Sequence, residues 1–135
     1  YFVFNKGLWK SLPDFIIGRP GYDNWLIWNI RRRLLPVIDA SEIINAVHQN
    51  HDYNFHNVKN RKGRDTGNET KVNIKLHKGK LLNILDATYK IVSNEIIKKT
   101  NPDEISRFWH RLPSVFPEFA IPIKLLRRIR FNVLK

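Results

Sequence analysis

Residues 18–33 read Gly-Arg-Pro-Gly-Tyr-Asp-Asn-Trp-Leu-Ile-Trp-Asn-Ile-Arg-Arg-Arg, and this stretch decides the fold that we predict. The Pro20-Gly21 pair bends the backbone. After the bend, apolar residues recur at helical spacing, with Trp25 and Trp28 along one stripe. Arginines close the stretch, where positive charge complements the carboxyl end of a helix dipole. The sequence therefore predicts a helix with a tryptophan-rich buried face directly after a tight turn.

Other segments extend this pattern in both directions. Asn101 can cap a helix that begins at Pro102, because proline is favoured at the first helical position. Strands are predicted at residues 1–4, 34–40 and 81–92, and helices at residues 71–78, 102 to about 112, and about 119 to 134. Alternation of helices and strands indicates an α/β fold.

The chain divides at a polar stretch. Residues 49–70 are almost all polar and include two glycines and many asparagines, which predicts a long loop. We expect a front part at residues 1–57, a polar loop at 58–70, and a basic strand-helix tail at 71–135 that packs on the front. Because the chain opens on an apolar run without a methionine, we expect it to be a piece of a longer protein.

Composition limits the class of protein. Hydrophobic residues make up 42% of the chain and aromatic residues 12%, so we expect a packed fold rather than a disordered segment. No apolar run approaches the roughly 18 to 20 residues that a membrane span needs. Absence of cysteine excludes disulfides and thiolate metal sites and fits a reducing compartment. We therefore expect a cytoplasmic protein.

Positive charge is concentrated in the second part of the chain. The net charge is +12, and residues 58–135 hold eighteen Lys or Arg against seven Asp or Glu. Arg127, Arg128 and Arg130 beside apolar residues could place the last helix on an anionic membrane at its inner face, or the helix could pack on its own domain. No nucleic-acid partner is expected, because the tail lacks a recognisable module.

The segment Gly18 to Trp25 is the first candidate site. Its glycines and proline allow backbone to approach a ligand closely, and the turn brings Asp23 and Asn24 to a helix start lined by Tyr22. Sugar sites commonly combine an aromatic face with carboxylate and amide groups that bind hydroxyls. The alternative is an ordinary helix start with a capping aspartate.

The segment His48-Gln-Asn-His-Asp-Tyr-Asn-Phe-His56 is the second candidate site. It directly follows an apolar run, and open α/β sheets form their sites at strand ends. Histidine and carboxylate ligands could hold a divalent ion and a diphosphate there. The alternative is a loop of solvated histidines. Acyl transfer and nucleotide hydrolysis have no support, because neither a nucleophile elbow nor a phosphate loop is present.

Four motifs follow one another along the first part of the chain. They are Tyr-Phe-Val-Phe-x-x-Gly-Leu, Leu-Pro-Asp-Phe-Ile-Ile-Gly-Arg-Pro-Gly-Tyr-Asp-Asn-Trp, Pro-Val-Ile-Asp-Ala and Val-His-Gln-Asn-His-Asp-Tyr. This order resembles the C-terminal half of bacterial proteins described as glycosyltransferases or nucleotide-diphospho-sugar transferase-like proteins. The resemblance covers residues 1–56 and returns faintly at 73–76 and 85–88.

This resemblance implies the C-terminal part of a GT-A-like fold followed by a basic, mostly helical tail. It implies the acceptor side of an enzyme with a nucleotide-sugar donor and a glycan or polysaccharide acceptor. Asp23 would be the catalytic base, and His48 and His51 would bind a divalent metal, Mn or Mg. The implied substrate-binding residues are Gly18, Arg19, Tyr22, Asn24, Trp25, Asp52 and Tyr53. A non-catalytic carbohydrate-binding or interaction module of the same fold is the alternative.

Overall fold

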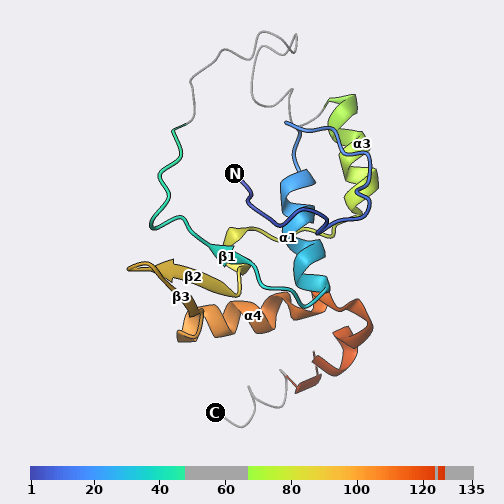
Figure 1. Ribbon diagram of the computed structural model, residues 1–135. Helices are drawn as coiled ribbons and strands as arrows, with labels where there is room; N and C mark the ends of the chain where they lie inside the picture. The colour runs from blue at the N-terminus through green and yellow to red at the C-terminus, as the bar shows by residue number, and fades with distance from the viewer. Residues whose placement is uncertain (48–66, 124, 127–135) are drawn as a thin grey trace.

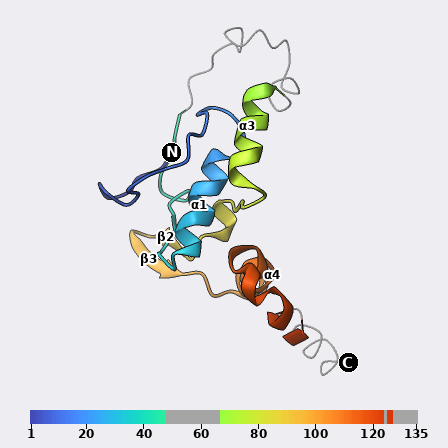
Figure 2. The same ribbon diagram turned by 90° about the vertical axis from the view of Figure 1, so that its right-hand side faces the viewer.

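The computed structural model describes residues 1–47, 67–123 and 125–126. Its elements in chain order are α1 (Tyr22–Arg32), β1 (Ile38–Asp39), α3 (Asn68–His77), the 3-10 turn η2 (Ile84–Asp86), β2 (Tyr89–Val92), β3 (Glu95–Lys98), α4 (Pro102–Val115) and the 3-10 turn η3 (Pro117–Phe119). Figures 1 and 2 show α1 in the middle, with α3 along one side of it and the sheet along the other. Helix α4 lies across the carboxyl end of α1. The predicted mixture of helices and strands is confirmed.

Helix α1 supplies most of the core. Trp25 and Trp28 are both buried, as their shared stripe predicted, and the two residues between them are buried as well. The core cluster is completed by Leu82 and Val115, from the part of the chain that follows the polar loop. Trp28 also donates a hydrogen bond from Nε1 to the Ser114 carbonyl at 2.9 Å. Each large apolar side chain buried in this way contributes about 1.5–3 kcal/mol.

The sheet has three strands in the order β1-β2-β3. Strand β1 pairs with β2 in parallel, with Ile38 opposite Tyr89, and β2 pairs with β3 in antiparallel. Just before this ladder, the Val37 carbonyl accepts hydrogen bonds from the backbone N–H groups of Thr88 at 3.0 Å and Tyr89 at 3.1 Å. Residues from the front part and the tail therefore share one sheet.

A β-hairpin replaces the single strand predicted at residues 81–92. Residues 84–86 form the turn η2, and β2 then continues through a tight turn into β3. Ser93 and Asn94 have φ values of 49° and 65°, a left-handed pair that matches the twist of a two-residue hairpin. The usual Asn-Gly or Asp-Gly signal is absent from this turn, so the sequence pattern did not indicate the hairpin.

Helix α4 confirms the predicted cap. The Asn101 side chain accepts a hydrogen bond from the Glu104 N–H at 2.8 Å, and the Glu104 carboxylate accepts one from the Asn101 N–H at 3.0 Å. Such a reciprocal pair satisfies two backbone donors at a helix start. The helix runs three residues beyond the predicted end, to Val115, with Pro113 in its last turn.

Two predicted strands differ from the structure. Residues 1–4 form no strand within the described part of the chain, and all four of their side chains are exposed, although the Phe4 ring also lies edge-on to Trp9. Within 34–40, only residues 38 and 39 pair. Leu34 adopts a left-handed φ of 58°, and Pro36 has no N–H to donate, so the ladder starts late.

Helix α3 is attached to the turn before α1 by one buried amide. Asn73 is fully buried, its Oδ1 accepts from the Ile16 N–H at 2.9 Å, and its Nδ2 donates to the Ile16 carbonyl at 3.0 Å. The carbonyls of Arg19 and Pro20 lie within 3.4 Å of the same Nδ2. Asn73 thereby fixes the segment that leads into α1.

The last predicted helix is only partly described. Helical residues follow η3 up to residue 126, whereas residue 124 and residues 127–135 lie outside the described part. The expected membrane contact of Arg127, Arg128 and Arg130 therefore stays a prediction. None of the helices in the described ranges has the length and apolar character to cross a bilayer.

Replacing Asn73 with alanine should destabilise the protein by about 2–4 kcal/mol, because buried backbone groups lose their partners and a cavity forms. Urea unfolding would measure this loss. Asn68→Ala, at the exposed first position of α3, serves as the control and should change stability by no more than about 0.5 kcal/mol. Equal stability of the two variants would contradict the role of Asn73.

Candidate functional site

The segment from Gly18 to Trp25 consists of the turn before α1 and the first residues of α1, and its turn is joined to α3. Arg19 is buried, with 9% of its surface exposed, and forms an ion pair with Glu69 in the first turn of α3. The turn is thus held by a charge pair as well as by the Asn73 amide. Arg19, one of the predicted substrate-binding residues, is used to attach α3.

Three other predicted substrate-binding residues also have internal contacts. Asn24 donates from Nδ2 to the Leu82 carbonyl at 2.8 Å, and its own carbonyl accepts from the Leu82 N–H at 3.1 Å. Trp25 lies in the core, where its ring centroid is 5.3 Å from that of Phe15. Tyr22 is half-buried against the same core. These side chains give the turn its shape.

Asp23 and Gly18 remain at the surface of the turn. Asp23 is exposed in the first turn of α1, and its Oδ1 accepts a hydrogen bond from the Asn24 N–H at 2.9 Å. Gly18 is exposed with a φ of +80°, and a side chain there would meet nothing within 4 Å. The turn therefore presents a carboxylate and an open stretch of backbone to solvent.

The second candidate site falls outside the described residues. His48, His51, Asp52 and Tyr53 all belong to the range 48–66. Over the ranges that are described, no group of three His, Cys, Asp or Glu residues could hold a metal ion. The divalent metal and its two histidine ligands therefore stay a prediction.

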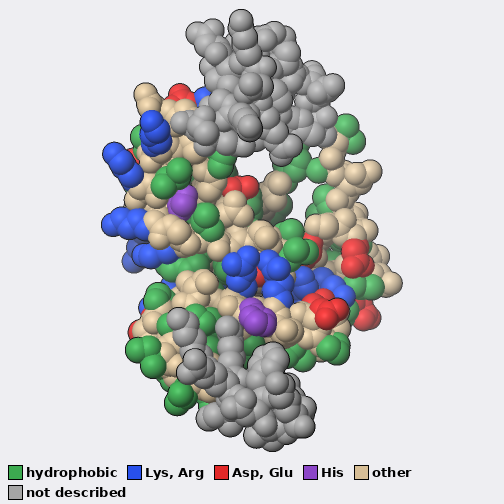
Figure 3. All heavy atoms as spheres, turned by 180° about the vertical axis from the view of Figure 1, so that it is seen from behind, with side chains coloured by type: hydrophobic (Ala, Val, Ile, Leu, Met, Phe, Trp, Pro, Cys, Tyr) green, Lys and Arg blue, Asp and Glu red, His purple; other side chains and the backbone are tan. Residues whose placement is uncertain are grey.

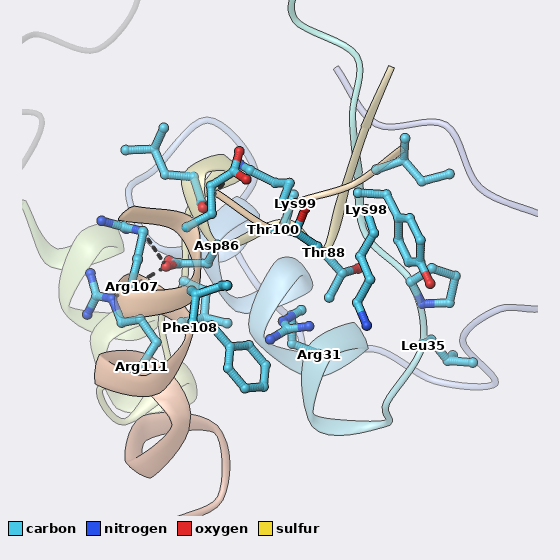
Figure 4. Close-up of a pocket in the computed structure, with 18 of the residues that line it drawn as sticks. Arg31, Leu35, Asp86, Thr88, Lys98, Lys99, Thr100, Arg107, Phe108 and Arg111 are labelled. Atoms are coloured by element: carbon cyan, nitrogen blue, oxygen red, sulfur yellow. Dashed lines mark hydrogen bonds and ion pairs between the residues drawn. The ribbon is translucent and has the colours of Figure 1, made fainter. Parts of the chain in front are cut away.

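A pocket of about 710 Å³ opens at the other end of α1. It lies between the carboxyl end of α1, the β2–β3 hairpin and α4, as Figure 4 shows. Its apolar walls come from several separate segments and include Leu35, Ile38, Ile96, Ile105 and Phe108. The size is ordinary for a small-molecule site.

The pocket is strongly cationic. Its charged lining consists of Arg31, Lys98, Lys99, Arg107 and Arg111 against the carboxylates of Asp86 and Glu104, a formal excess of +3. In Figure 3, Lys and Arg side chains gather in a band across the middle of one face, above α4, and along the edge over α3. Part of the excess of basic residues predicted for the second part of the chain therefore lies around this pocket.

Both carboxylates of the pocket already have cationic partners. The Asp86 side chain is 3% exposed, and its Oδ1 accepts from Arg107 Nε at 2.7 Å, with Arg111 Nε 3.6 Å away. Glu104 lies 3.4 Å from the Lys90 ammonium. Burial alone would raise the pKa of Glu104, but the Asn101 N–H and Lys90 hold that pKa below its ordinary value. Both carboxylates thus lie in contact with basic side chains.

Arg31 occupies an unusual position in this pocket. Its guanidinium carbon lies 5.3 Å from the centre of the Phe108 ring, and its Nε is buried without a hydrogen-bond partner among the described residues. Burial lowers the pKa of Arg31, and the Asp86 charge only partly opposes this shift. In Figure 4 the Lys98 side chain points toward the same part of the pocket as Arg31.

The sequence pattern does not indicate this pocket. It contains the arginines at the end of α1 and an excess of basic residues after residue 58, but nothing in it shows that these residues meet. Residues 31, 98 and 107 converge only because the unpredicted hairpin turns back beside α1 and α4. The useful signal was Asp86, an acid that interrupts an apolar run and proves to be the buried partner of Arg107.

Comparison with known proteins gives no assignment: no protein-family model, curated protein or solved structure matches this chain.

Replacing Gly21 with alanine should cost more stability than replacing Gly18. Both glycines have positive φ, which alone costs about 1–2 kcal/mol for another residue. A Cβ at Gly21 would also lie 2.7 Å from Cδ2 of the buried His77 ring. We expect losses of about 1 kcal/mol for Gly18→Ala and about 2–4 kcal/mol for Gly21→Ala in urea unfolding. Equal losses of unfolding free energy in the two variants would show that the His77 ring moves aside at no cost.

Acid should weaken the fold through His77. This histidine is buried, its Nδ1 accepts a hydrogen bond from the Gly79 N–H at 3.0 Å, and burial lowers its pKa from the ordinary 6.5. Because the unfolded chain then binds the proton more tightly, the free energy of unfolding should fall as pH drops below about 6.5.

Urea unfolding at a series of pH values would test this dependence. His77→Asn should reduce the slope between about pH 7.5 and 5.5, whereas His110→Asn, at an exposed position on α4, should leave it unchanged. A slope that persists in His77→Asn would assign the pH dependence to other groups.

Proposed function

We propose that this chain is the acceptor-side part of a GT-A-like glycosyltransferase that moves a sugar from a nucleotide-sugar donor to a glycan or polysaccharide acceptor. The motif order over residues 1–56 supports the family. The observation that carries the proposal is the exposure of Asp23 in a turn whose neighbouring side chains are fixed by internal contacts. A catalytic base needs this combination of access to substrate and a rigid support.

Asp23 would act on the acceptor hydroxyl. As the hydroxyl oxygen forms a bond to the anomeric carbon of the donor, the bond from that carbon to the diphosphate breaks, and the Asp23 carboxylate takes the proton. Gly18 would offer backbone at the edge of the acceptor, and Tyr22 would offer part of a ring face. Arg19, Asn24 and Trp25 would contribute by holding Asp23 in place.

The remaining parts of the proposal concern residues outside the described ranges. Asp52 and Tyr53 would contact substrate, and His48 and His51 would bind a divalent metal. Such an ion would stabilise the leaving diphosphate. These roles rest on the resemblance alone.

The Asp23→Asn variant should slow sugar transfer by about 10²- to 10⁴-fold, because the amide cannot accept the proton. The measurement is release of nucleoside diphosphate by the full-length protein from a panel of UDP- and GDP-hexoses, with manganese and a panel of oligosaccharide acceptors. Asp14→Asn, an equal change of charge at another exposed position before α1, should leave the rate unchanged.

The possible results separate three conclusions. Equal rates for Asp23→Asn and the wild type would remove Asp23 as the base. Loss of transfer in both variants would point to charge rather than proton transfer. Saccharide binding that needs neither metal nor nucleotide, with no transfer by the wild type, would favour the non-catalytic carbohydrate-binding module.

A further inference from the structure

The cationic pocket at the carboxyl end of α1 has charge that the protein itself does not balance. Asp86 is paired with Arg107, and Glu104 is paired with Lys90. In the described part of the chain, Arg31, Lys98 and Lys99 form no ion pair with a carboxylate, although the Lys99 ammonium lies 3.4 Å from the Leu85 carbonyl. Three cations of the lining therefore remain available to an anion.

Arg31 is the cation whose position most favours an added anion. One of its donors is shut away from solvent with no acceptor among the described residues, and its guanidinium rests on the Phe108 ring. A desolvated charge with an unused donor is costly, and an anion placed beside the guanidinium offsets that cost. The Lys98 ammonium approaches the same space from the hairpin (Figure 4).

The chemistry of these cations selects a phosphate group. A guanidinium presents a planar fork of donors that fits phosphate oxygens in pairs, and lysine ammonium groups bind phosphate as point charges. A phosphate monoester carries nearly two negative charges at neutral pH, so it matches the excess of +3 better than a single carboxylate does.

The walls select an organic phosphate over the inorganic ion. Ile96, Ile105 and Phe108 border the pocket and are each at least 42% exposed, so they offer apolar surface that a ligand would cover. A phosphate group alone fills a small part of about 710 Å³. An apolar or aromatic body attached to the phosphate would use the rest of the space.

We propose that this pocket binds a small organic phosphate, with the phosphate between Arg31 and Lys98 and an apolar or aromatic body against the hairpin and α4. The site lies at the opposite end of α1 from Asp23. It does not depend on whether the protein transfers a sugar.

Calorimetry and backbone NMR titration with phenyl phosphate, hexyl phosphate and inorganic phosphate would test the site. Both organic phosphates should bind about tenfold more tightly than inorganic phosphate, and their shifts should centre on residues 96–108. Arg31→Gln and Lys98→Gln should each weaken phenyl phosphate binding about tenfold. Lys75→Gln, on exposed α3, removes the same charge away from the pocket and should not weaken binding.

The outcomes are decisive in either direction. Lys98 is exposed on the hairpin, so Lys98→Gln still tests the site if Arg31→Gln proves unstable. No binding by the wild type at millimolar phenyl phosphate, or equal weakening by Lys75→Gln, would overturn the proposal. Binding to phosphatidic acid vesicles, with none to the soluble esters, would also overturn it, because the surface would then recognise a membrane.

Discussion

The buried amide of Asn73 is the contact on which the arrangement of this chain depends. It joins Ile16 to α3 across a sequence separation of 57 residues and satisfies backbone groups that the turn itself leaves open. Because residues 16–20 lead directly into α1, their attachment to α3 sets the direction in which α1 crosses the core. A fully bonded amide in a buried site favours one arrangement strongly, since any displacement leaves polar groups without partners.

The direction of α1 in turn places the two candidate sites. An eleven-residue helix is about 16 Å long, and Asp23 lies in its first turn whereas Arg31 lies in its last. The buried tryptophans between them keep this separation fixed. One small chemical group cannot touch both ends, so the ligand groups that we propose for the exposed carboxylate and for the cationic pocket belong to different parts of a large ligand or to two different ligands.

Local sequence signals predicted α1, the Asn101 cap and the start of α4, because each depends on residues within one or two turns. Local signals did not predict the β2–β3 hairpin, because its Ser93-Asn94 turn lacks a glycine. They also did not predict that β1 is short, because its length depends on the backbone of Leu34 and on the distant Thr88. The candidate site was predicted from residue types, their spacing and the resemblance in motif order, none of which shows tertiary contacts. Arg19, Asn24 and Trp25 have the chemistry of a sugar site, but their partners Glu69, Leu82 and Phe15 come from elsewhere in the fold, and sequence gives no sign of such pairing.

The excess of positive charge at the end of α1 bears on what the pocket is for. The Asp86 side chain is almost fully buried and accepts hydrogen bonds from Arg107 and from the Asn83 N–H, the latter at 2.9 Å. Its carboxylate oxygens are therefore largely occupied in joining η2 to α4. Arg31, Lys98 and Lys99 line the same cavity, where like charges repel, and the Asp86 charge only partly offsets the cost of burial at Arg31. Unfavourable electrostatics that packing does not require are typical of binding sites, where the ligand supplies the missing charge. The same cations spread over the surface would have a lower electrostatic free energy and would give equal solubility. This comparison favours a ligand-binding role for the pocket over a structural one.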